Sequence, residues 1–114
     1  MIGTNTERDF KLENYEEFYE HHYFEPIPEK FCLTVNEVIP RFGWAFDQVE
    51  EIKPTSLLDL GCLDGSFALS VGHQLGIPVT GIDLTKDGID LAKERAKAHG
   101  ITATFEQGFV EDWL

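Results

Sequence analysis

The chain has 114 residues, 42% of them apolar, which allows one domain with a core of ordinary size. Its 21 acidic and 9 basic residues give a net charge of −12, which disfavours nucleic acid phosphates and anionic membranes as direct partners. No run approaches the roughly 20 apolar residues of a membrane span, and the polar first ten residues do not resemble a signal peptide. Cys32 and Cys62 are too few and too scattered for a disulfide framework or a zinc site, so we expect no metal and a reducing, cytoplasmic setting.

Residues 6 to 22 have the apolar spacing of an amphipathic helix. Tyr15, Tyr19 and Tyr23 follow one another at intervals of four, and we expect this row to pack onto the domain. His21 and His22 are adjacent, so their side chains would point in different directions on a helix. A catalytic role for either histidine is therefore disfavoured.

Two prolines at alternate positions impose an extended link before residue 29. An apolar stripe with helical spacing follows as far as residue 52, and Pro40 interrupts it. We therefore expect a break between Asn36 and Pro40 and a second helix from about residue 40 to 51. Trp44 and Phe46 are expected in the core.

The stretch from Ser56 to Gly65 reads Ser-Leu-Leu-Asp-Leu-Gly-Cys-Leu-Asp-Gly. Its apolar start, with a proline before it and glycines after it, predicts a buried strand that breaks into a tight turn. From Ser66 the apolar residues recur at the spacing of a short helix. A strand, a glycine turn and a helix bring a ligand close to the backbone and to a helix N-terminus. The sequence therefore predicts a ligand-binding turn.

The glycine spacing indicates which ligand this turn suits. A dinucleotide pyrophosphate requires Gly-x-Gly-x-x-Gly, whereas Gly61 and Gly65 have three residues between them. Asp59 stands two residues before the first glycine, where a carboxylate would repel a pyrophosphate but could hold an ammonium group. An ordinary buried strand with a glycine turn is the alternative interpretation.

A second strand is predicted from Pro78 to Asp83, and a helix from about Thr85 to Gly100. Residues 101 to 107 alternate between apolar and polar side chains, which predicts a third strand. The alternation of strands and helices indicates the α/β class, with a parallel half-sheet and right-handed crossovers.

Asp83 follows Gly61 by 22 positions and stands at the carboxyl end of the second strand. The carboxyl ends of neighbouring parallel strands meet at one edge of the sheet, where open α/β sheets bind ligands. A carboxylate there can accept hydrogen bonds from both hydroxyls of a ribose, which suits S-adenosylmethionine and NAD alike. A helix-capping or surface carboxylate is the alternative.

The turn resembles the first signature of class I S-adenosylmethionine-dependent methyltransferases, Asp-x-Gly-x-Gly-x-Gly. Asp59, Gly61 and Gly65 match it, and Leu63 replaces the middle glycine, which the turn can accommodate if the φ of Leu63 is negative. The resemblance implies that S-adenosylmethionine is the cofactor. Its methionine end would lie on the turn, at Asp59, Gly61, Cys62, Leu63 and Gly65.

The resemblance extends through Thr80 to Leu84. It implies that Asp83 binds the ribose and that Leu84 packs on the adenine. After the third strand the family often has Gly-Asp, whose acid receives the adenine amino group, whereas this chain has Gly108 and Phe109. The resemblance therefore places Gly108 and Phe109 at the adenine, where the backbone or the phenyl ring could contact the base.

The resemblance implies a Rossmann-like three-layer sandwich, with a partial parallel sheet of strand order 3-2-1 preceded by N-terminal helices. Residues 1 to 53 would form a helical segment and possible lid, and residues 54 to 114 the first half of the cofactor-binding domain. Complete members of the family have seven strands and take most catalytic and substrate residues from the part after the fourth. We therefore expect the natural protein to continue beyond Leu114, and the catalytic residues are unknown.

Three functions are open at this point. The first is the cofactor-binding part of a methyltransferase, with a small-molecule acceptor favoured and neither nucleic acid nor membrane expected as a partner. The second is an NAD-binding oxidoreductase domain, which Asp59 and the glycine spacing disfavour. The third is a non-catalytic half-domain used for interaction. In each case the rest of the chain or a second copy is expected to cover the open edge of the sheet.

Overall fold

The computed structural model describes residues 25 to 114. The helix expected over residues 6 to 22, its tyrosine row and its two histidines lie outside the described residues. Within them, no helix combines the length and the apolar character needed to cross a membrane. The elements in chain order are η1 (Glu29–Phe31), α3 (Val35–Val38), α4 (Pro40–Ile52), β1 (Leu57–Leu60), α5 (Ser66–Leu75), β2 (Val79–Asp83), α6 (Lys86–Ala98), β3 (Ala103–Gln107) and η2 (Val110–Trp113).

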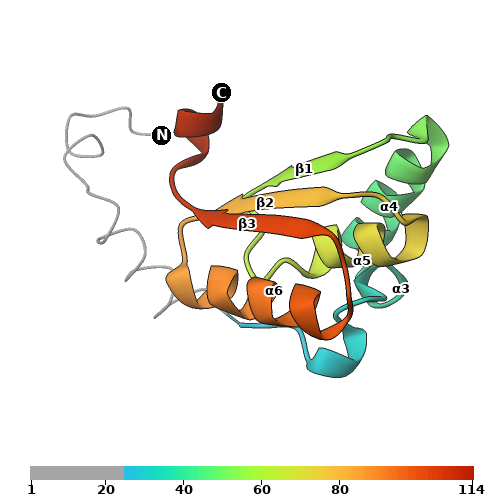
Figure 1. Cartoon of the computed structure of the whole chain (residues 1–114). Helices are drawn as coiled ribbons and strands as arrows, with labels where there is room; N and C mark the ends of the chain where they lie inside the picture. The colour runs from blue at the N-terminus through green and yellow to red at the C-terminus, as the bar shows by residue number, and fades with distance from the viewer. Residues whose placement is uncertain (1–24) are drawn as a thin grey trace.

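The three strands form a parallel sheet with β2 in the middle, so the expected α/β class and the order 3-2-1, counted from the β3 edge, are confirmed. Leu57 of β1 is paired with Val79 of β2, which is paired with Ala103 of β3. The crossover helices α5 and α6 lie on the same face of the sheet (Figure 1). This arrangement brings the carboxyl ends of β1 and β2 together at one edge.

The opposite face of β1 is exposed in the described part of the chain. β1 alternates along its length, and its outward-facing Leu58 and Leu60 are 50% and 38% exposed. Leu57 packs instead against the core on the helical side. The buried strand expected here is therefore buried on one face only, because the described helices cover one side of the sheet.

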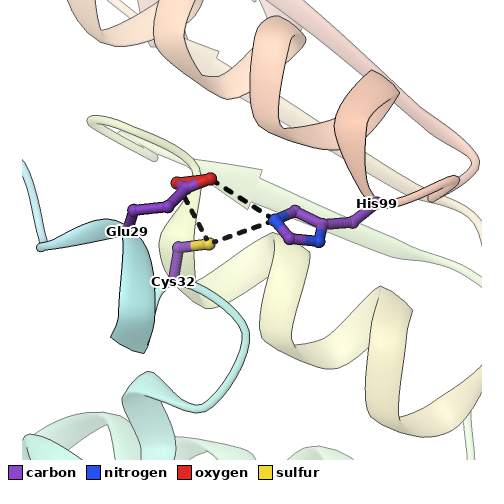
Figure 2. A group of neighbouring side chains, drawn as sticks. All are labelled: Glu29, Cys32 and His99. Atoms are coloured by element: carbon purple, nitrogen blue, oxygen red, sulfur yellow. Dashed lines mark hydrogen bonds and ion pairs between the residues drawn. The ribbon is translucent and has the colours of Figure 1, made fainter.

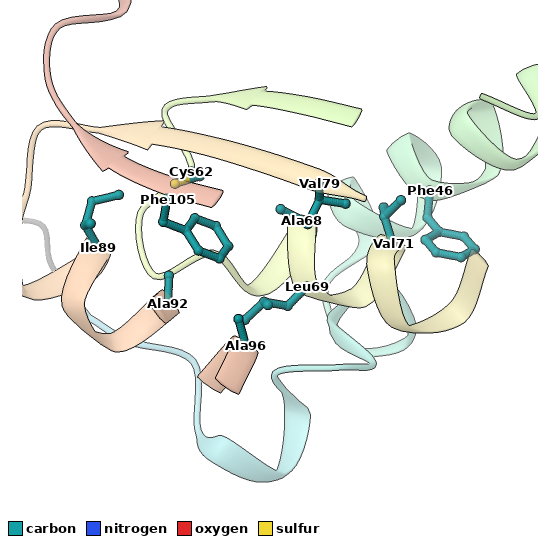
Figure 3. Packing of buried hydrophobic residues seen from close by; sticks show 10 residues of the cluster. All are labelled: Phe46, Cys62, Ala68, Leu69, Val71, Val79, Ile89, Ala92, Ala96 and Phe105. Atoms are coloured by element: carbon teal, nitrogen blue, oxygen red, sulfur yellow. The ribbon is translucent and has the colours of Figure 1, made fainter. Parts of the chain in front are cut away.

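The core lies between the sheet and the helices (Figure 3). Phe46 is buried as expected, but the prediction for Trp44 was wrong, because its side chain is 69% exposed. The two residues are two positions apart on α4 and so face about 200° away from each other around the helix axis. The buried cluster consists of Phe46, Cys62, Ala68, Leu69, Val71, Val79, Ile89, Ala92, Ala96 and Phe105.

The helical stripe breaks where the proline predicted it. Ile39 is extended, with φ −110° and ψ 115°, and it separates α3 from α4. Pro40 is the first residue of α4, where the missing N–H costs no helical hydrogen bond. The break lets α4 pack against α3 and α5, beside the start of the sheet (Figure 1).

Candidate cofactor-binding site

The turn between β1 and α5 is held against the end of β2. The N–H groups of Gly61 and Cys62 both donate to the carbonyl of Ile82, at 2.7 and 3.0 Å. Gly61 has φ +83°, and a Cβ added to it would meet no atom within 4 Å. This glycine therefore faces open space, and it leaves backbone accessible at the edge of the sheet where a ligand is expected.

Leu63, which stands in place of the signature's middle glycine, adopts a left-handed conformation. Its φ is +51°, so the condition of a negative φ is not met. Its N–H donates to Oδ1 of Asp83 at 3.0 Å, and this contact holds the turn in place. A left-handed L-residue costs roughly 1 to 2 kcal/mol. The turn therefore carries a local strain at Leu63, which the hydrogen bond to Asp83 helps to hold.

Gly65 has a packing role. Its φ is +76°, and an added Cβ would lie 2.7 Å from Cβ of Ala92 and 2.9 Å from the ring of Phe105. Only glycine allows α6 and β3 to approach the turn this closely. Gly65 therefore shapes the turn from behind and does not line either of the pockets described next.

Two pockets flank the turn. The first has a volume of about 300 Å³ and the second of about 290 Å³, and both are lined by Gly61 and Leu63. Asp83, Leu84 and Val110 complete the first pocket. The second is completed by Glu25, Ile27, Arg41, Phe42, Ala45, Asp59, Cys62, Asp64, Ser66 and Phe67. The ligand edge expected from the strand ends is therefore hollowed on both sides of one glycine turn.

Asp83 is 7% exposed, and both of its oxygens already have partners in the protein. Oδ1 accepts from the N–H of Leu63, and Oδ2 accepts from the N–H and the hydroxyl of Thr85 at 3.0 and 2.7 Å. A carboxylate has about four acceptor positions, so about one is left for a ligand. Asp83 therefore fixes the turn and the start of α6, and its capacity for ribose is smaller than the two hydrogen bonds expected from the sequence.

Asp59 lies in the second pocket, half-buried at the end of β1. Burial, and secondarily the negative charge of Asp83, raise the pKa of Asp59 to about 6. A carboxylate held in this way gains from a nearby cation, because the cation favours the ionised form. A cation bound next to Gly61 would therefore be stabilised by the Asp59 carboxylate.

The second pocket also offers groups that suit an anion. The hydroxyl of Ser66, the first residue of α5, is buried and has no hydrogen-bond partner among residues 25 to 114. Arg41 is the only basic side chain among the described residues that line this pocket. An ammonium partner, an unpartnered hydroxyl and a guanidinium together fit the amino acid end of S-adenosylmethionine. Sequence reasoning missed Ser66 and Arg41, although the position of Ser66 directly after Gly65 was a usable signal.

A buried ion pair behind the turn was also missed. Asp64 accepts hydrogen bonds from the N–H of Ser66 at 3.0 Å and from the N–H of Ile27 at 2.7 Å. Arg95 of α6 places Nη1 3.5 Å from Oδ2 of Asp64 and donates from Nη2 to the carbonyl of Ile27 at 2.8 Å. The pair therefore ties the extended link to the turn and to α6. No spacing in the sequence marks contacts between residues this far apart.

The remaining expected residues divide into two groups. Leu84 lines the first pocket, and Cys62 lines the second with a thiol whose pKa is raised by burial and by Asp59, so that it stays neutral. Gly108 and Phe109 line neither pocket. The N–H of Gly108 donates to the carbonyl of Asp83 at 2.9 Å. Val110, which directly follows Phe109, lines the first pocket instead.

The chain is similar to known methyltransferases. A family model described as "Methyltransferase domain" matches residues 57–114. The 23S rRNA (uracil(747)-C(5))-methyltransferase RlmC of Shewanella amazonensis is 40% identical over 75 residues, which are 65% of this chain and 19% of that protein. The ubiquinone biosynthesis O-methyltransferase of Haemophilus ducreyi is 33% identical over 72 residues, which are 63% of this chain and 30% of that protein.

A solved structure shows the same fold. The PH0226 protein from Pyrococcus horikoshii OT3 is 24% identical, with a TM-score of 0.56 over 87% of this chain and 40% of that one. The present chain thus spans less than half the length of each of these three proteins. The family match covers the strand, turn and helix unit and every residue that lines the first pocket, whereas part of the second pocket is lined by residues before position 57. The chain therefore belongs to the methyltransferase domain family, whose class I members take the methyl group from S-adenosylmethionine.

Proposed function

We propose that this chain binds S-adenosylmethionine across both pockets and serves as the cofactor-binding part of a methyltransferase. The adenosine would lie in the first pocket and the amino acid end in the second. One observation carries this assignment: the two pockets share Gly61 and Leu63, and the two strand-end carboxylates are divided between them, Asp83 in the first and Asp59 in the second. The ligand that suits them has a ribose at one end and an ammonium group at the other.

The residues of this chain would bind and orient the cofactor. Asp83 would accept from a ribose hydroxyl, Leu84 would pack on the base, and Asp59 would hold the ammonium group, with Ser66 and Arg41 on the carboxylate side. The cofactor supplies a methyl group on a sulfonium, so its placement relative to the acceptor carries much of the catalysis. Gly108 and Phe109 remain proposed neighbours of the adenine through the backbone next to Val110. No catalytic base is assigned to this chain.

Calorimetric titration of the full chain with S-adenosylmethionine, adenosine and NAD tests this proposal. We expect S-adenosylmethionine to bind, adenosine to bind more weakly, and NAD not to bind, because Asp59 would oppose a pyrophosphate. Binding of NAD without binding of S-adenosylmethionine would favour an oxidoreductase domain. A folded chain that binds none of the three would instead favour an interaction module.

The acceptor is a separate question. We propose a small molecule, because the net charge of −12 gives this chain no basic surface for phosphates. One relative, however, is named for a base of 23S rRNA, so the charge of this segment alone is a weak argument against nucleic acid. Retention of the chain on an RNA column at low salt, with release at moderate salt, would overturn the small-molecule proposal.

The same proposal divides the chain into residues 1 to 53 and residues 54 to 114. It also includes a cytoplasmic location. Five residues of the first part line the second pocket together with the glycine turn: Glu25, Ile27, Arg41, Phe42 and Ala45. This contact supports the idea that the first part helps to enclose the cofactor. A chain that starts at residue 54 should accordingly bind S-adenosylmethionine more weakly than the full chain, provided that it folds.

A further inference from the structure

Three potential metal ligands meet at the other side of the domain. Glu29 belongs to η1, Cys32 follows it, and His99 is the C-cap residue of α6 (Figure 2). Cys32 and His99 are 67 positions apart, so no local spacing in the sequence indicates a site here. His99 lies at the opposite end of α6 from Thr85, so this cluster is separate from the cofactor pockets.

The spacing of the three donor atoms matches a tetrahedral metal site. Sγ of Cys32 lies 3.9 Å from Nε2 of His99, Oε1 of Glu29 lies 3.4 Å from the same Nε2, and one donor atom from each of the three residues lies within 4.8 Å of the other two. With zinc–ligand bonds of about 2.0 to 2.3 Å, the donors of a tetrahedral site lie roughly 3.4 to 3.6 Å apart. Small side-chain rotations would therefore bring the three atoms around one ion.

The chemistry of the cluster also suits a divalent cation. The Cys32 side chain is fully buried, and a coordinating metal deprotonates a thiol outright. One thiolate and one carboxylate then neutralise the two positive charges of the ion. Thiolate, imidazole and carboxylate form a mixed set of ligands that zinc accepts.

Arg95 supports Glu29 without occupying the ligand position. Its Nε lies 2.8 Å from Oε2 of Glu29. This contact is an ion pair only, because Nε of Arg95 makes no hydrogen bond within the described residues. Oε1 faces His99 and is available to a metal, while Oε2 keeps its cationic neighbour. Outer contacts of this kind orient metal-bound carboxylates in proteins.

We propose that Glu29, Cys32 and His99 bind one Zn²⁺ ion. Solvent completes the coordination, because the side chains of Glu29 and His99 are 60% and 32% exposed. The ion joins the segment after the extended link to the end of α6. Since Ile27, two residues before Glu29, is bonded to the glycine turn through Asp64, the ion would stabilise one wall of the second pocket from outside. The site is structural and does not depend on the proposed cofactor.

Titration of the reduced, metal-free full chain with zinc chloride tests the proposal. We expect one ion per chain, and Co²⁺ in its place should give thiolate charge-transfer absorption with intense tetrahedral visible bands. Glu29→Gln, Cys32→Ser and His99→Gln should each weaken zinc binding at least roughly 100-fold, because changes in the outer shell alone cost 10- to 100-fold. Glu29 and His99 are exposed, so two of these variants should fold normally.

Matched controls distinguish this site from adventitious binding. Glu37→Gln makes the same change at an exposed acid outside the cluster, Cys62→Ala removes the other thiol, and His21→Gln with His22→Gln removes two other histidines. All should bind zinc as the parent does. Zinc should also slow tryptic cleavage after Lys30, which lies within η1. The absence of zinc binding, unchanged binding in the three cluster variants, or loss of binding in the His21 and His22 variant would overturn the proposal.

Discussion

The N–H of Leu63 donates a hydrogen bond to Oδ1 of Asp83, 3.0 Å away, and this contact joins the turn after β1 to the carboxylate that ends β2. The residue that replaces the signature's middle glycine thus contacts the acid expected to recognise the ribose. Leu63 lines both pockets, so the strained residue is also the boundary between them. The two halves of the proposed cofactor site are therefore coupled through one residue.

The strain at Leu63 can be measured. Leu63→Gly should be more stable than Leu63→Ala by roughly 1 kcal/mol, because glycine adopts a positive φ without the penalty and both variants lack the leucine side chain. Leu63→Ala keeps the strain and should give no stabilisation. Urea unfolding of the three proteins gives the free energies. A Leu63→Gly variant no more stable than Leu63→Ala would show that the backbone at residue 63 is not strained.

Gly61→Val should abolish binding of S-adenosylmethionine, because the new side chain enters the space that the ligand is proposed to occupy. A matched control is Gly76→Val, since Gly76 also has a positive φ and nothing within 4 Å of an added Cβ, but lines neither pocket. Both variants should lose at least roughly 1 to 2 kcal/mol of stability from backbone strain. Calorimetry on the folded variants separates strain from ligand exclusion, and equal affinities would place the ligand elsewhere.

The raised pKa of Asp59 predicts a pH dependence of stability. The native state holds the proton more tightly than the unfolded chain, since its pKa is about 6 against an ordinary 3.8. Ionisation of Asp59 therefore opposes folding, and stability from this group falls as the pH rises from about 4 to 6, by at most about 3 kcal/mol. Other acids titrate in this window, so the quantity to measure is the difference between the parent and Asp59→Asn. A constant difference from pH 4 to 7 would contradict the assignment.

The pair formed by Asp64 and Arg95 should be important for stability. Arg95→Met leaves the buried carboxylate of Asp64 without its cation. Such a change typically lowers the free energy of unfolding by about 3 to 5 kcal/mol, and we expect a loss in this range. Adding Asp64→Asn should recover part of this loss, because the amide needs no counter-charge. A double-mutant cycle by urea unfolding measures the coupling. Strictly additive losses would show that Glu29 or the backbone carbonyl of Ile27, and not Asp64, is the effective partner of Arg95.

The fold could be predicted from local patterns because each element carries its own signal. The proline at position 40, the glycines of the turn and the apolar faces of α5 and α6 are read within a few residues of sequence. Trp44 was misplaced because an apolar stripe does not show which of its members reaches the core when only one side of a helix is covered. The positive φ of Leu63 also depends on tertiary structure, since a hydrogen bond to Asp83 on another strand helps to hold this conformation.

The site could be predicted only in part. The ends of β1 and β2 are visible in the sequence pattern, and they position four residues that line the pockets: Asp59, Gly61, Asp83 and Leu84. The supporting contacts join Asp64 to Arg95 and Cys32 to His99, which are 31 and 67 positions apart. Tertiary packing creates such contacts, and a single sequence contains no periodicity that would reveal them.

The most direct measurement compares two ligands on two variants. Asp59→Ala should weaken S-adenosylmethionine at least roughly tenfold, which corresponds to about 1.4 kcal/mol, while adenosine binds as before. Asp83→Ala should weaken both ligands, by roughly 10- to 100-fold, since one charge-assisted hydrogen bond and the anchoring of Leu63 are lost together. Circular dichroism must first show that both variants are folded. If Asp83→Ala leaves adenosine binding intact, or if Asp59→Ala weakens adenosine as much as S-adenosylmethionine, the assignment of the two pockets is wrong.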